Sequence, residues 1–141
     1  SLDKPRLLYV GRIKVEKGIF SFLKIFREIN FDTELSIVGN NNDIKKNQLI
    51  DLDNFAAQVK ALDLVISISN ATVHFSGALG INTIVLLSYN QSWRWFEGKH
   101  DSPWYPGVMK LCRQKKGDEW GDVICHVGRL LDENLSCYGK K

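Results

Sequence analysis

Short apolar runs alternate along the chain with segments whose apolar residues recur at helical spacing. Runs of four or five residues, rich in Leu, Ile and Val, predict buried strands at 7–10, 34–38, 64–68, 83–87 and 108–112. Helical periodicity predicts helices at 16–30, 54–62 and 118–131. A further short helix is expected between 69–70, where Ser or Asn can act as N-cap, and Gly80, which suits a C-terminal cap.

This order of elements predicts an α/β fold of the Rossmann-like, three-layer type. Strands separated by helical crossovers pair in parallel with right-handed connections, so the sheet is expected to be mostly parallel. A length of 141 residues suits one domain, which we place at 1–131, with 132–141 as a frayed tail.

Composition and charge argue against some classes of protein, among them nucleic-acid-binding, membrane-spanning and metal-binding proteins. Nineteen basic and sixteen acidic side chains give a net charge of only +3, which argues against a nucleic-acid partner. We expect no transmembrane segment and no signal peptide. Three cysteines without metal-ligand spacing (Cys112, Cys125 and Cys137) predict reduced thiols in a cytoplasmic protein and no metal.

Polar residues gather at the start of the predicted short helix, just after a buried strand. Ser69 or Asn70 can cap it, Thr72 lies in its first turn, and His74 lies four residues after Asn70. The N-terminus of a helix carries partial positive charge and unpaired N–H groups, so this cluster suits a phosphate. The structural alternative is that these residues only cap the helix and that His74 is a packed side chain.

A second candidate anion site follows the first strand. Gly11 allows a close turn of the backbone, and Arg12 and Lys17 could both reach an anion at the sheet edge. The alternative is that both basic side chains are simply solvated.

The segment 88–107 is long and rich in aromatic residues and turn formers. Trp93 and Trp95 could stack on a base or sugar, with Arg94 near a phosphate. The alternative is that the aromatic side chains, Trp95 and Trp104 in particular, cover the open edge of the sheet.

Two resemblances are carried by motifs. Residues 6–40 resemble the start of the C-terminal domain of GT4-like glycosyltransferases (glycosyl transferases group 1) through Tyr9-Val-Gly-Arg12, Glu16-Lys-Gly18 and Leu35-Ser-Ile-Val-Gly39. That resemblance implies that Arg12 and Lys17 contact the diphosphate of a nucleotide-sugar.

Residues 49–131 resemble the glycosyltransferase segment of bacterial tetratricopeptide-repeat proteins, related to O-GlcNAc transferases and heptosyltransferases. The matching motifs are Asp53-Asn-Phe-Ala-Ala, Ala61-Leu-Asp-Leu-Val-Ile-Ser67, Ser69-Asn-Ala-Thr72-Val-His74, Gly77-Ala-Leu-Gly80, Trp93-Arg-Trp95, Asp101-Ser-Pro-Trp-Tyr-Pro106 and Arg113-Gln114. His74 matches the motif histidine, whereas many relatives carry Asp-Thr in place of Ser69-Asn70.

Together the resemblances imply the C-terminal, donor-binding half of a GT-B glycosyltransferase. The ligand would be a UDP- or GDP-sugar, bound without metal at Gly11, Arg12, Lys17, Ser69, Asn70, Thr72 and His74. The acceptor and the catalytic base would belong to an N-terminal domain outside this chain, so no catalytic residue is assigned and the isolated chain is expected to be inactive. The alternative is a non-catalytic nucleotide-binding or interaction domain whose site has decayed.

Overall fold

A computed structural model describes residues 5–10, 34–38, 51–90, 92–117 and 120–135 of the chain. The strands are β1 (Arg6–Val10), β2 (Glu34–Val38), β3 (Leu64–Ile68), β4 (Thr83–Leu87) and β5 (Met109–Arg113). The helices are α3 (Leu52–Lys60), α4 (Ala71–Ala78), the 3-10 turn η2 (Trp93–Trp95) and α5 (Trp120–Leu135).

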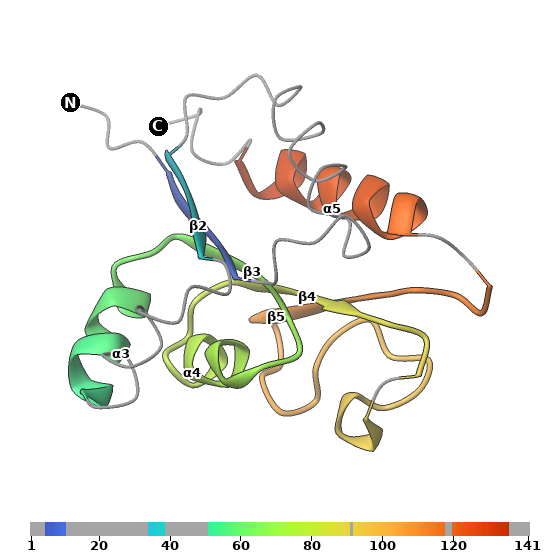
Figure 1. Cartoon of the computed structure of the whole chain (residues 1–141), viewed down its shortest axis with the longest axis horizontal. Helices are drawn as coiled ribbons and strands as arrows, with labels where there is room; N and C mark the ends of the chain where they lie inside the picture. The colour runs from blue at the N-terminus through green and yellow to red at the C-terminus, as the bar shows by residue number, and fades with distance from the viewer. Residues whose placement is uncertain (1–4, 11–33, 39–50, 91, 118–119, 136–141) are drawn as a thin grey trace.

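The five strands form one parallel sheet in the order β2-β1-β3-β4-β5. Helix α5 covers one face, and α3 and α4 cover the other (Figure 1). The predicted α/β fold with a parallel sheet is therefore confirmed. Because β3 is the middle strand, whatever follows its carboxyl end lies near the centre of that sheet edge.

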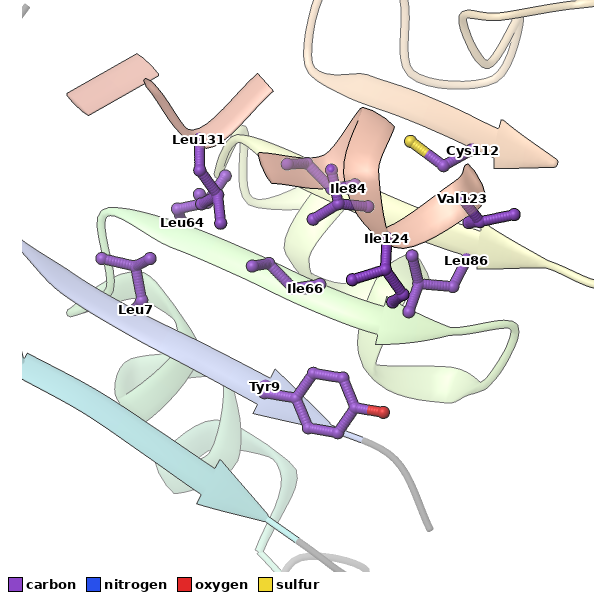
Figure 2. Packing of buried hydrophobic residues seen from close by; sticks show 11 residues of the cluster. Leu7, Tyr9, Leu64, Ile66, Ile84, Leu86, Cys112, Val123, Ile124 and Leu131 are labelled. Carbon is purple, nitrogen blue, oxygen red and sulfur yellow. The ribbon is translucent and has the colours of Figure 1, made fainter. Parts of the chain in front are cut away.

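Side chains that alternate along each strand build the two sides of the core. From β3 and β4, Leu64, Ile66, Ile84 and Leu86 pack against α5, as Figure 2 shows. Their neighbours Val65 and Val85 point to the opposite face, toward α3 and α4 respectively. Strands covered on both faces have no polar side to present, which explains why their sequences are continuous apolar runs.

The helix ends follow the predicted capping chemistry. Asp51 accepts a hydrogen bond from the backbone N–H of Asn54 at 2.8 Å and so caps α3. Asn70 caps α4, and Gly80 follows that helix with a φ of +72°, a conformation that glycine adopts at little cost.

Some boundaries differ from the sequence prediction, and some predictions lie outside the described residues. Helix α5 continues to Leu135, four residues past its predicted end, and β5 lies one residue later than expected. The predicted helix 16–30 and the candidate residues Gly11, Arg12 and Lys17 are outside the described ranges. No helix within those ranges has the length and apolar character needed to cross a bilayer.

Residues 100–102 run beside β5 in the opposite direction. The carbonyl of His100 accepts from the N–H of Leu111 at 2.6 Å, and the N–H of Ser102 donates to the carbonyl of Met109 at 3.1 Å. Asp101 lies opposite Lys110, and their side chains form an ion pair at 2.6 Å. This strip occupies the outer edge of β5 and ties the aromatic segment 88–107 to the sheet.

Candidate functional site

The described candidate residues lie together at the carboxyl end of β3. Ser69 and Asn70 connect β3 to α4, and Thr72 and His74 belong to the first half of α4. Ligands of open parallel sheets bind beyond the carboxyl ends of the strands, so the position fits a binding site. The residues are half-buried rather than fully exposed.

Both ends of the Asn70 side-chain amide make hydrogen bonds within the protein. Its side-chain oxygen accepts from the N–H of Thr72 at 2.9 Å, and its side-chain amide donates to Oγ of buried Ser67 at 2.9 Å. The side-chain amide of Asn70 thus caps α4 and connects the start of this helix to β3. This arrangement is the structural role that capping chemistry predicts for an Asn at a helix start.

Ser69 anchors the aromatic segment. Its Oγ accepts a hydrogen bond from the indole N–H of Trp95 at 2.9 Å. Trp95 is completely buried, with the polar end of its ring satisfied by this bond. Complete burial excludes the hypothesis that Trp95 stacks on a nucleobase. Trp93, in contrast, is 77% exposed.

Two aromatic residues from the segment 88–107 hold the imidazole of His74. The ring stacks on Trp95, with centroids 5.3 Å apart and planes inclined by 14°. Its Nδ1 lies 3.1 Å from the hydroxyl oxygen of Tyr105. The ring of Tyr105 in turn packs on Gly77, one turn further along α4, where a Cβ would lie 2.6 Å from Tyr105 Cγ.

The surroundings of His74 favour its neutral form. Burial, and secondarily the positive charge of Arg94, lower the pKa of His74 from its usual 6.5. A neutral imidazole can accept the Tyr105 hydroxyl at Nδ1, which leaves the proton on Nε2. Nε2 makes no hydrogen bond to any residue that the structure describes. Within that part of the chain, its N–H is therefore available to a ligand.

Arg94 adds a cation beside the start of α4. Its Nε donates to Oγ of Ser92 at 3.1 Å, while its backbone carbonyl accepts from the indole N–H of Trp104 at 2.8 Å. It forms no ion pair with an acidic residue of the described ranges. An exposed guanidinium near a helix N-terminus and a neutral histidine donor is suited to an anion.

Arg113 fixes the segment that carries Arg94 and Trp95. Its guanidinium donates to the carbonyls of Trp95 and Phe96, at 3.1 Å and 2.9 Å. These bonds connect the end of β5 to η2. The aromatic segment is therefore held from three sides, through Ser69, Arg113 and the strip beside β5.

Sequence reasoning selected His74 but missed the residues that orient it. Tyr105 and Arg113 belong to the motifs that carry the glycosyltransferase resemblance, but neither was assigned a role at the site. The available signal was on α4, where His74 and Gly77 lie three residues apart on one face. A glycine in a helix next to a candidate ligand indicates that another group packs closely there.

Metal-ligating side chains do not gather in groups of three or more within the described ranges. Cys112 is buried, which raises the pKa of its thiol to about 12, and Cys125 on α5 is exposed. Both are free thiols.

Comparison with known proteins found one partial relative. No protein-family model and no solved structure matches the chain. Protein FlbA of Caulobacter vibrioides is 42% identical to it over 81 residues, which are 57% of this chain and 13% of FlbA. The chain is therefore similar to a small part of a much longer protein, and it spans only 13% of that relative's length.

Proposed function

We propose that the chain is the donor-binding domain of a GT-B glycosyltransferase, and that the start of α4 binds the diphosphate of a UDP- or GDP-sugar. The observation that carries the proposal is the His74 imidazole, stacked on Trp95 and bonded through Nδ1 to Tyr105, with no described residue hydrogen-bonded to Nε2. The resemblance of residues 6–40 and 49–131 to glycosyltransferases supplies the substrate class.

In this proposal the bound diphosphate receives hydrogen bonds from Nε2 of His74 and from the hydroxyl of Thr72. Arg94 supplies positive charge from the exposed side, and the resemblance to GT4-like glycosyltransferases implies the same role for Arg12 and Lys17. Donors and charges fixed in place before the reaction stabilise the nucleoside diphosphate as it leaves the sugar. The acceptor and the catalytic base belong to the N-terminal domain of the larger enzyme.

One observation favours the second candidate function, a nucleotide-binding or interaction domain without catalysis. The side chains of Asn70 and Ser69 are held by internal bonds to Ser67, Thr72 and Trp95, and one of the two amide hydrogens of Asn70 is used there, so they are positioned for packing rather than for a diphosphate. A domain of this kind would bind nucleotide weakly or not at all. Affinity therefore separates the two functions.

Calorimetric titration with UDP and GDP tests the proposal. We expect saturable binding, weakened by about 1–3 kcal/mol in His74→Ala, because a charge-assisted hydrogen bond is lost. His100→Ala tests a different location for the nucleotide, since His100 is an exposed histidine that lies outside the α4 site and lines another cavity. Unchanged affinity in a folded His74→Ala variant contradicts the proposal, and loss of affinity in His100→Ala moves the diphosphate to another site.

A further inference from the structure

A cavity lies between the end of β5 and α5, on the side of the sheet that α5 covers. Its volume is about 710 Å³, and its lining comes from the segment before β5, from the turn after β5 and from α5. We call it the β5–α5 cavity. Buried Leu111, Cys112 and Val123 give it an apolar floor. Its size is that of a small-molecule site, for which about 300–1,000 Å³ is usual.

The wall of the β5–α5 cavity is strongly basic. Five Lys and Arg side chains line it, against two acidic ones, Glu97 and Asp122. The basic residues are Lys99, Arg113, Lys115, Lys116 and Arg129. In the described ranges the ion pairs are Arg6–Asp63 and Lys110–Asp101, and neither involves a residue of this wall. Glu97 and Asp122 offset only part of the positive charge of this wall.

Two histidines line the cavity, and the pKa of one of them, His126, responds to the surrounding charges. His100 comes from the strip beside β5 and His126 from α5, and both line the cavity. Burial, then the charges of Arg129 and His100, lower the pKa of His126, while Glu133 acts weakly in the opposite direction. Side chains from separate segments thus lie close enough to repel one another. An anion between them would relieve that repulsion.

We propose that the β5–α5 cavity binds a small soluble ligand that carries two or more phosphate groups on an organic body. The Lys and Arg side chains are spread around the wall of the cavity. They therefore suit a ligand with several phosphate groups better than a ligand with a single carboxylate. The apolar floor suits the organic part of the ligand. This site is distinct from the α4 site and does not depend on the proposed function.

The three histidines of the chain allow a direct test. His74 reports on the α4 site, and His100 and His126 report on the β5–α5 cavity. Inorganic pyrophosphate is titrated into the full chain, and the imidazole resonances are followed by NMR. We expect the His100 and His126 signals to move in a saturable way, and the pKa of His126 to rise, because a bound anion favours the imidazolium.

Charge-removing variants complete the test. The double variant Lys115→Gln/Lys116→Gln changes two exposed side chains, and we expect it to weaken pyrophosphate binding by about tenfold. Lys110→Gln is the matched control, since Lys110 is an exposed lysine of β5 outside the cavity. Its affinity for pyrophosphate should not change.

Three outcomes would overturn the proposal. The first is movement of the His74 signal alone, which supports the α4 site and leaves the cavity without a ligand. The second is an equal loss of affinity in Lys110→Gln, which indicates unspecific attraction. The third is tighter binding of a short poly-glutamate peptide than of pyrophosphate, which assigns the cavity to an acidic segment of a protein.

Discussion

At the scale of single residues, Tyr105 determines how His74 presents its proton. Replacing Tyr105 by Phe keeps the ring on Gly77 but removes the hydroxyl beside Nδ1. We expect the pKa of His74 to rise, because the hydrogen bond to the neutral ring is lost, and stability to fall by about 1 kcal/mol. The ¹⁵N shifts of the imidazole across a pH titration measure both its pKa and its tautomer.

An unchanged tautomer and pKa in Tyr105→Phe would show that the hydroxyl only fills space. Tyr89→Phe is the control, because Tyr89 is an exposed tyrosine of the same segment, 47% accessible. That variant should leave the His74 titration unaltered.

Residue chemistry alone predicted the local contacts but not the distant ones. The capping role of Asn70 follows from its type and from its position before a helix, and the structure confirms it. The contact of His74 with Tyr105 joins residues 31 positions apart, and no local sequence pattern predicts it. The stacking of His74 on Trp95 also joins residues far apart in the sequence. For this reason His74 could be predicted as a site residue, but its contacts with Trp95 and Tyr105 could not.

At the scale of elements, one helical glycine is closely packed and another is open to solvent, so that their alanine variants can be compared. A Cβ at Gly77 would lie 2.6–2.8 Å from the ring of Tyr105, whereas a Cβ at Gly121 would meet no atom within 4 Å. Gly77→Ala should lower the free energy of unfolding by about 1–3 kcal/mol through overpacking. Gly121→Ala should raise it by up to about 1 kcal/mol through helix propensity. Urea unfolding of both variants measures the difference.

Equal effects of the two alanines would mean that Tyr105 yields without cost and does not hold α4. Nucleotide titration of folded Gly77→Ala gives a second measurement, because a displaced Tyr105 also releases His74. Gly121→Ala should bind nucleotide as the unaltered chain does.

The elements that sequence predicted best are those whose pattern is local. The first four strands are short runs dominated by Leu, Ile and Val, so the runs from 7–10 to 83–87 were located within a residue of their ends. The path of segment 88–107 could not be predicted, since hydrogen bonds to Ser69, Arg113 and β5 define it. Turn-forming residues indicate that the chain bends, but they do not indicate which part of the sheet the segment packs against.

At the scale of the whole molecule, two histidines couple stability to pH. The pKa values of His74 and His126 are both lowered in the folded state, mainly by burial. The unfolded chain therefore binds protons more readily, and the free energy of unfolding should fall as the pH drops below about 6.5 toward the folded pKa values. Above that range their contribution is complete. Urea unfolding at about pH 7.5 and pH 5.5 measures the loss.

The double variant His74→Gln/His126→Gln removes both groups and should flatten this part of the pH profile. A slope of the same size in that variant would assign it to carboxyl groups instead. The profile concerns folding, so it applies whichever ligand the chain binds.

The whole-molecule charge of +3 concealed how unevenly charge is distributed. Arg113, Lys115 and Lys116 are close in sequence, but the other cations of the β5–α5 cavity come from distant segments. Only the fold brings Lys99 and Arg129 to the same cavity. A net charge close to zero therefore does not exclude a local anion site.

The strip 100–102 beside β5 covers backbone groups with which a second copy of this protein could otherwise pair. A bare strand edge can template the addition of a strand from a neighbouring molecule, which is a common first step toward aggregation. Here His100 and Ser102 already occupy backbone groups on the outer side of β5. Detachment of this strip, for instance by proteolytic cleavage at the exposed residues Pro103 or Trp104, would free those groups. The aromatic segment that orients His74 would thus also protect the protein from self-association through this edge.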